Sequence, residues 1–374
     1  MNPGVIEAQP ALLPLKRISP SRFVRLRVCA LQEIWAASAT PSLLPRNPLA
    51  ILGTVAHQVL EEAGREDGFV AAERWTRRIA ALNKELHQSW LDSRLVPLER
   101  LVPQYEVLKL RTCMRAQKIA AALKKQRSGR HFPGIGFEIW VESKDKSVGG
   151  WIDSVRQSRA GIELSDFKSG ELFEQHGGIQ RGELKKSHQA QLKLYAALYF
   201  QTYGVWPSTI QIIPLAGATL DVPFTQAECK DLLEEATQKL RSLNASISHQ
   251  ETVGPESFAS PSPQNCRFCG YRPVCWRYQE EMGSGLQTDG WPKDAVGRVW
   301  DINVLSSSRV NLRVCGEGGK EYTFRDLSSL TERNPSLREI RRGDRVGIFN
   351  AQTSANRVEF SESVSTVLYK LPGS

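Results

Sequence analysis

Two aspartates and a lysine in residues 149–170 form the most informative chemical pattern in this sequence. The segment GGWIDSVRQSRAGIELSDFKSG is typical of two β-strands joined by a turn. If the turn is centred between residues 159 and 160, antiparallel pairing sets Asp153 opposite Asp166. Residues two apart on a strand project from the same face, so Lys168 joins the two carboxylates. The sequence therefore predicts a compact cluster of two acids and one base.

Such a cluster supports two interpretations. Two adjacent carboxylates repel each other unless a proton or a divalent cation intervenes, and their hard oxygen atoms suit Mg²⁺ or Mn²⁺. A lysine beside such a metal can hold a water molecule in line with a phosphorus atom and offset developing negative charge. Alternating charges also occur on ordinary salt-bridged surface hairpins, and the hairpin alone does not distinguish the two cases.

Two helical motifs add polar side chains at helical spacing. The segment GTVAHQVLE places His57 and Glu61 one turn apart on one helical face, and imidazole is a ligand for Mn²⁺ and other borderline metals. A lone histidine of this kind is more often a partly buried, hydrogen-bonded residue. The segment QLKLY places Gln191 and Tyr195 one turn apart and says little by itself.

The cysteines suggest a second metal-binding group. Cys266, Cys269 and Cys275 follow a C-x2-C-x5-C pattern, and a C-x2-C turn can aim two thiolates at one metal. Cys29, which lies 237 residues upstream, is a candidate fourth ligand. Spacing alone does not separate zinc from an iron–sulfur cluster. The other cysteines match no motif and are expected to be ordinary buried or half-buried residues: Cys113, Cys229 and Cys315.

In their order along the chain, the motifs G-x3-H-x2-L-E, G-x-I-D, D-x-K-x-G and Q-x3-Y resemble the RecB-like branch of the PD-(D/E)XK nuclease superfamily. The resemblance covers roughly residues 19–280 and implies an α/β core, a mixed sheet flanked by helices. No core position is missing. The roles that the resemblance implies are divalent-metal ligation by His57, Asp153 and Asp166, catalysis by Lys168, and orientation of the site or the DNA by Gln191 and Tyr195.

The placement of the cysteines resembles the iron–sulfur nucleases of the AddB type and the CRISPR-associated RecB-like exonucleases. In both groups, one cysteine precedes the histidine motif and three follow the Gln/Tyr helix. The resemblance implies a 4Fe–4S cluster held by Cys29, Cys266, Cys269 and Cys275, which would tie both ends of the nuclease domain together. Zinc and free thiols are the alternatives.

Composition and charge narrow the class of protein. The 374 residues carry a formal charge of +9, and no apolar run approaches the length of a membrane span. The N-terminus lacks the pattern of a secretory signal, so we expect a cytoplasmic protein. Residues 100–131 hold nine basic side chains and one acid. These bases are either phosphate contacts or a solvated helix face, and the candidate DNA contacts are Arg111, Arg115, Lys118, Lys124, Lys125 and Arg127.

The element pattern predicts two domains. We expect a nuclease domain over residues 1–282, a linker over 283–293, and a small barrel over 294–374. Five strands with a helix before the fourth resemble an OB-fold, which would either bind single strands or dock proteins. The aromatic residues considered for base stacking are Trp300, Tyr322, Phe324 and Phe349. The helices expected in the first domain span residues 19–38, 51–64, 70–91, 103–126, 185–203 and 225–248, and its strands span 135–142, 148–157, 161–168 and 209–215.

These features together predict a metal-dependent DNA nuclease, an exonuclease acting mainly on single-stranded ends, in DNA repair, CRISPR or antiphage defence. The sequence contains no G-x4-G-K-[ST] motif, so a helicase or defence-complex partner would be a separate chain. The alternative is a non-catalytic subunit that binds single-stranded or duplex DNA ends. Such a subunit would be expected to lack Asp153, Asp166 or Lys168, and all three are present.

Overall fold

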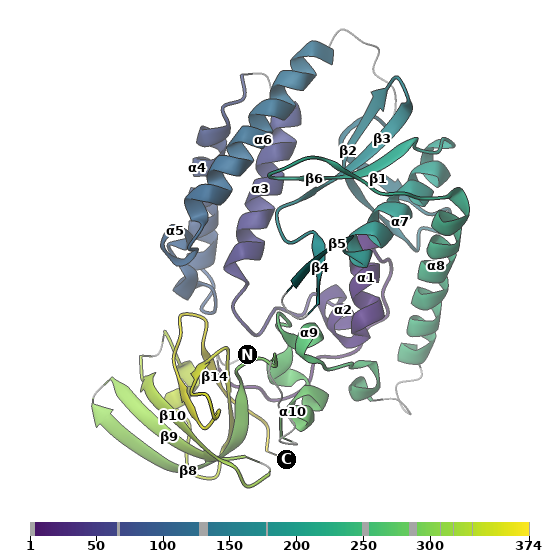
Figure 1. Cartoon of the computed structure of the whole chain (residues 1–374). Coiled ribbons are helices and arrows are strands. Elements are labelled where there is room, and N and C mark those ends of the chain that lie inside the picture. The colour runs from purple at the N-terminus through teal and green to yellow at the C-terminus, as the bar shows by residue number, and fades with distance from the viewer. Residues whose placement is uncertain are drawn as a thin grey trace.

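Two β-sheets organise the computed structural model, one in the first two-thirds of the chain and one at its C-terminal end (Figure 1). The structure describes residues 4–65, 68–126, 134–176, 179–248, 254–283, 290–306, 308–316, 318–330 and 332–373. Within those ranges, no helix is both long enough and apolar enough to cross a membrane.

The first sheet has five strands in the order β1-β2-β3-β6-β7. The first three form an antiparallel meander, β6 pairs parallel with β3, and β7 pairs antiparallel with β6. A parallel pair needs a crossover connection, and helix α7 (Lys186–Tyr203) supplies it between β3 and β6. The strands span Gly136–Glu142 (β1), Gly149–Ser158 (β2), Gly161–Lys168 (β3), Thr209–Pro214 (β6) and Leu220–Asp221 (β7).

Helices cover both faces of this sheet, as the α/β expectation requires (Figure 1). The hydrophobic core on the α3 side contains Phe167 of β3, and the core on the α7 side contains Leu164 of the same strand. Alternate residues of one strand thus enter different cores. On the α3 side lie α3 (Pro48–Arg65), α4 (Ala71–His87) and α6 (Tyr105–Gln126), and on the α7 side lie α7, α1 (Pro20–Val28) and α8 (Gln226–Ser248).

The predicted helix over residues 19–38 is interrupted. Cys29 has an extended backbone (φ −150°, ψ 104°) and separates α1 from α2 (Ala30–Ala37). Helical spacing of apolar residues on both sides concealed this break. The buried Glu33 of α2 accepts hydrogen bonds from Arg22 (2.8 Å) and Arg25 (2.5 Å) of α1, which holds the two helices at the bend. The bend places Cys29 at a helix junction.

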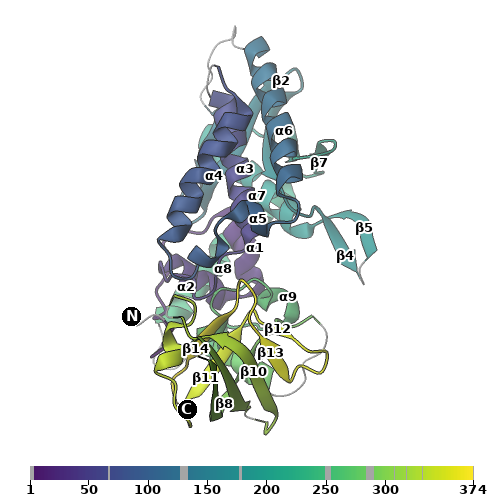
Figure 2. The same cartoon turned by 90° about the vertical axis from the view of Figure 1, so that its left-hand side faces the viewer.

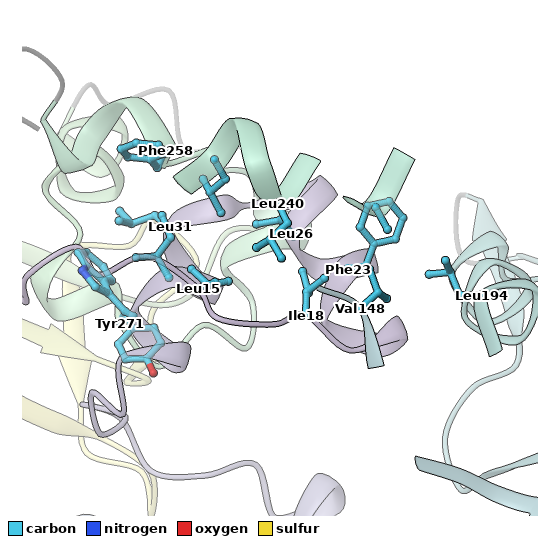
Figure 3. Packing of buried hydrophobic residues seen from close by; sticks show 14 of the residues in the cluster. Leu15, Ile18, Phe23, Leu26, Leu31, Val148, Leu194, Leu240, Phe258 and Tyr271 are labelled. Carbon is cyan, nitrogen blue, oxygen red and sulfur yellow. The ribbon is translucent and has the colours of Figure 1, made fainter. Parts of the chain in front are cut away.

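The N-terminal helices pack against chain segments far away in sequence. Figure 3 shows Leu26 of α1 close to Leu240 of α8, and Leu31 of α2 near Phe258. Phe258 ends a short 3₁₀ segment, η2 (Pro255–Phe258). All four side chains are buried, so this core joins the start of the chain to the segment before Cys266.

A β-hairpin that was not predicted from the sequence lies between strand β3 and helix α7 in the chain. Strands β4 (Phe173–His176) and β5 (Ile179–Leu184) pair with each other and with no other described strand. Figure 2 shows the hairpin projecting from the body of the molecule. None of the hairpin side chains that the structure describes is buried, and its sequence has no clean alternation of apolar residues.

The C-terminal sheet is a curled half-barrel with the strand order β12-β13-β10-β9-β8-β11-β14. Five strands and a helix were predicted. In the described residues the sheet has seven strands, and the predicted helix is a single 3₁₀ turn, η4 (Pro335–Arg338). The strands span Ala295–Ser306 (β8), Arg309–Cys315 (β9), Glu321–Ser328 (β10), Arg345–Phe349 (β11), Gln352–Thr353 (β12), Glu359–Ser361 (β13) and Val367–Lys370 (β14).

Three of the four aromatic residues considered for base stacking on this sheet are instead core residues. Phe324 and Phe349 are fully buried, and Tyr322 is 8% exposed. Tyr322 and Phe324 belong to the core of the C-terminal sheet, whereas Phe349 packs on the other face, in the core that also contains residues of α1 and α2. Trp300 is 43% exposed, and the guanidinium of Arg313 lies 5.2 Å from its ring.

A buried arginine joins the C-terminal sheet to the segment 266–275, here called the cysteine loop. Arg272 donates to the carbonyl oxygens of Cys266 (2.9 Å) and Cys269 (3.0 Å). It also donates to Asp294 Oδ2 (2.7 Å) and to Asn350, two residues at the C-terminal sheet. Asp294 has a side chain that is 1% exposed, so the pair is almost fully removed from water. The remaining short elements of this region are α9 (Pro263–Cys266), η3 (Arg272–Val274) and α10 (Trp276–Gly283). Between α4 and α6 in the sequence lie η1 (Ser93–Leu95) and α5 (Leu98–Leu101).

We predict that Arg272→Met destabilises the protein by about 3–5 kcal/mol, because it leaves the carboxylate of Asp294 buried without a cation. Guanidinium denaturation of the full chain measures the effect. The matched control is Arg277→Met, since the exposed Arg277 pairs with Glu280 and Glu281 on its own helix, α10, and its replacement should cost less than about 1 kcal/mol. Equal losses in the two variants would contradict the role given to Arg272.

Candidate active site

The candidate site lies where strands β2 and β3 stop pairing. The ladder runs from Ser158–Gly161 to Ser154–Ser165, which confirms the predicted turn centre and register. The next pair along the two strands would be Asp153 and Asp166. Instead of continuing the ladder, Asp153 Oδ2 accepts a hydrogen bond of 2.6 Å from the backbone N–H of Phe167. The carboxylate thus replaces a strand carbonyl and is fixed at the end of the hairpin.

Asp166, Lys168 and Gln191 form a closed triangle of side chains. Lys168 Nζ lies 2.7 Å from Asp166 Oδ2 and donates to Gln191 Oε1 at 3.0 Å. Gln191 in turn donates to Asp166 Oδ1 at 2.9 Å. Helix α7 therefore reaches down to the strand and holds both charged groups in place. The sequence identified Gln191 only through the resemblance, and the structure brings it into contact with both partners.

His57 approaches the carboxylates from the opposite helix layer. Its Nδ1 lies 3.6 Å from Asp153 Oδ2, and its ring packs edge-on against Phe167 with ring centres 6.3 Å apart. Helix α3 can come this close because Gly53 has no side chain. A Cβ at Gly53 would lie 2.6 Å from Ser169 Oγ, just after Lys168. This contact explains the glycine in the G-x3-H motif physically.

Burial favours the uncharged form of three titratable side chains at the site. Desolvation and the charge of Asp166 raise the pKa of Asp153 well above its ordinary value. Burial also lowers the pKa of His57, which favours a neutral imidazole that can act as a ligand. The pKa of Tyr195 is raised by burial and by the two aspartates, so its hydroxyl stays protonated. Tyr195 lies against β2, since a Cβ at Gly150 would be 3.3 Å from Tyr195 Oη.

Glu138 is a third carboxylate at the site that the sequence reading missed. The pairs on either side of it, Phe137–Ser154 and Ile139–Ile152, set Glu138 opposite Asp153 across β1 and β2. Burial and Glu138 raise the pKa of Glu61 to about 7. A signal was available: the loop SKDKSV centres the β1–β2 hairpin, and counting outward from it reaches this pair.

The donor atoms fit a hard divalent cation. Asp166 is 3% exposed, and its Oδ2 receives no hydrogen bond, although the Lys168 ammonium lies close to it. That ammonium balances one negative charge, so the second carboxylate, Asp153, is the one whose ionised form a divalent cation would stabilise. As the side chains stand, no three His, Cys, Asp or Glu residues in the described parts of the chain form a group that could hold a metal ion. The two carboxylates would be the principal donors, and His57 would have to move toward them.

Comparison with known proteins agrees with this geometry. The profile of the PD-(D/E)XK nuclease superfamily matches residues 17–276, which is more than half of the chain. This chain belongs to the PD-(D/E)XK nuclease superfamily. No curated protein matches the chain significantly.

The four cysteines predicted to act together line one small pocket in this PD-(D/E)XK protein. Trp35, Tyr271 and Tyr278 are among the other side chains around it. Burial raises the pKa of Cys266 to about 11 and the pKa values of Cys269 and Cys275 to about 12. Without a metal these thiols are therefore protonated at neutral pH. The four lining cysteines are Cys29, Cys266, Cys269 and Cys275.

The predicted DNA-binding helix is α6, and the structure describes only part of its basic surface. Arg111 and Lys118 are exposed, which suits contact with a polyanion. Arg115 is half-buried and donates to the carbonyl oxygen of Gly217 at 2.8 Å, so part of its role is structural. The side chains of Lys124 and Lys125, and all of Arg127, lie outside the described part of the structure.

We predict that Asp153→Asn abolishes stabilisation by Mn²⁺ while leaving the metal-free protein folded. Asparagine keeps an oxygen that can accept from the Phe167 amide, but it removes one buried charge and its repulsion with Asp166. A ligand that binds only the folded state raises the melting temperature, so thermal unfolding with EDTA or with Mn²⁺ measures this. The control is Asp145→Asn, a change outside the site. An equal Mn²⁺ shift in wild type and Asp153→Asn would contradict the assignment of Asp153.

Proposed function

We propose that this protein is a metal-dependent deoxyribonuclease that hydrolyses phosphodiester bonds at single-stranded DNA ends. The observation that carries the proposal is the joint placement of Asp153, Asp166 and Lys168 by the interrupted hairpin, within the matched superfamily region. Asp153 and Asp166 would hold Mg²⁺ or Mn²⁺, with His57 as a further ligand. DNA repair, CRISPR and antiphage defence are the settings in which we expect it to act.

The chain's own residues have distinct tasks in this reaction. A bound divalent cation would neutralise phosphate charge and lower the pKa of a water molecule. Lys168 would orient the attacking water and offset charge that develops on the phosphate. Its ammonium can do so because Asp166 and Gln191 restrict it from two sides. Gln191 and Tyr195 are positioning residues that keep the strand ends and helix α7 in register.

We expect Lys168→Ala to lower the cleavage rate by at least about a hundredfold and to leave oligonucleotide affinity nearly unchanged, because the lysine acts mainly on the transition state. Cleavage of end-labelled single-stranded DNA with Mn²⁺ measures the rate. The control is Lys193→Ala. Lys193 lies on α7, outside the triangle of Asp166, Lys168 and Gln191, and pairs with the exposed Glu228. Wild-type protein that binds DNA ends without cleaving them would instead indicate a non-catalytic subunit.

We propose further that Cys29, Cys266, Cys269 and Cys275 hold an iron–sulfur cluster. Their shared pocket supports this, because it joins a helix junction near the N-terminus to the cysteine loop. Four sulfur donors suit either a cluster or zinc, and the solitary distant Cys29 favours the cluster over paired C-x2-C zinc sites. A bound group of this kind would make part of its binding free energy available for folding.

Replacing Cys29 with alanine should remove iron and sulfide together and leave a protease-sensitive protein, although Cys29 is remote from the catalytic motifs in sequence. A cross-link closing so long a loop contributes several kcal/mol, on the order of a disulfide in a similar position. Metal analysis and the visible spectrum of anaerobically purified protein measure this. Cys113→Ala and Cys315→Ala are the controls. Stoichiometric zinc without iron would refute the cluster.

The C-terminal sheet is proposed to be an OB-like barrel that begins after a linker at residues 283–293. Support comes from the strand pairing: β11 pairs with β8, and β13 pairs parallel with β10, as expected for a small barrel whose last strand is divided. Residues 284–289 of the expected linker lie outside the described parts of the chain. The basic face of α6 is proposed as a second, sequence-independent contact with DNA.

A further inference from the structure

A groove of about 1010 Å³ lies where three parts of the protein meet. One wall is formed by helices α3 and α4, and the second by the cysteine loop. The third wall belongs to the C-terminal sheet and includes Lys293, just before β8, and Asn350, just after β11. Figure 1 shows these three regions adjoining one another below α3. The α3 wall contains Thr54 and Gln58, which flank His57 in sequence, so the groove reaches the helical turn that bears the candidate metal ligand.

The charge of the groove is complementary to a polyanion. Its charged lining consists of five bases and one acid: Arg46, Arg78, Arg267, Arg272, Lys293 and Glu85. Three of the bases form ion pairs within the protein, namely Arg46, Arg78 and Arg272. Arg267 and Lys293 are exposed and form no ion pair with any residue that the structure describes. These two side chains are therefore the cations most available to a ligand's phosphate groups.

An exposed aromatic ring, Phe268, also lines the groove and lies between Cys266 and Cys269 in sequence. Phe268 is 65% exposed, an unusual state for a phenyl group, and the Arg267 guanidinium lies 5.0 Å from its ring centre. The backbone beneath it is held in place, because Arg272 donates to the carbonyl oxygens of Cys266 and Cys269 on either side. The loop thus presents a flat apolar face at a fixed position, at low cost in conformational entropy on binding.

We propose that this groove binds a single-stranded polynucleotide, with a base stacked on Phe268 and phosphates contacted by Arg267 and Lys293. An unpaired strand is required because a base inside a duplex cannot expose its face to the ring. Aromatic stacking is tolerant of base identity, which suits a strand that must pass through in any sequence. This inference rests on the proposed nuclease function. The groove would hold the single strand before the strand reaches the site at His57.

The test is the affinity of the full-length protein for a fluorescent thymidine oligonucleotide of about 20 nucleotides, measured in EDTA so that cleavage does not intervene. Phe268→Ala should weaken binding by about 5- to 100-fold. Phe268→Trp should restore it, and its indole fluorescence should be quenched by the bound strand. Arg267→Ala and Lys293→Ala should each flatten the plot of log K against log salt by up to about 0.7.

Val205→Ala is the control, because Val205 is also an exposed apolar side chain, 52% exposed, yet does not line the groove. Its oligonucleotide affinity should equal that of wild type. Unchanged affinity in both Phe268→Ala and Arg267→Ala would overturn the proposal, as would losses seen with duplex but not with single-stranded DNA. If these variants lose affinity but the wild type cleaves no DNA with any divalent cation, the nuclease proposal fails and the groove assignment stands.

Discussion

The contact between the Asp153 carboxylate and the Phe167 amide determines the rest of the site. It ends the β2–β3 ladder at the Ser154–Ser165 pair, so two acids lie side by side where strand pairing would otherwise continue. Helix layers on both faces of the sheet then exclude water from these acids. Their charge is balanced within the protein by Lys168, which Gln191 restrains. A site of this kind has stored repulsion that a divalent cation would relieve.

A second constraint keeps the ends of the chain together. The N-terminal helices and the cysteine loop share one hydrophobic core, and the C-terminal sheet has its own core but also contributes Phe349 and Tyr369 to the shared one. Arg272 is central to this assembly, since one guanidinium satisfies carbonyl oxygens of the cysteine loop and the buried Asp294. The hydroxyl of Tyr369 also donates to the carbonyl oxygen of Leu43 at 2.7 Å. The groove exists because these three regions are fixed relative to α3.

Local patterns predicted the elements of the first sheet well. Its strands and main helices agree with the expected ranges to within a few residues, because alternation and helical spacing report directly which face is buried. The same patterns failed at Cys29, where apolar spacing continues through a bend that Glu33 stabilises. They also could not show that Phe324 and Phe349 are buried rather than exposed, since an aromatic residue suits either side of a strand until the sheet has packed.

For the site, the sequence by itself determined the hairpin register, and with it the meeting of Asp153, Asp166 and Lys168, because turn geometry acts over only a few residues. The order of the motifs also identified the superfamily. Tertiary structure alone decided the approach of His57, the contacts of Gln191 and the gathering of the four cysteines around one pocket. These arrangements join segments separated by tens to hundreds of residues, and their geometry depends on how helices pack on a sheet, which no local pattern encodes.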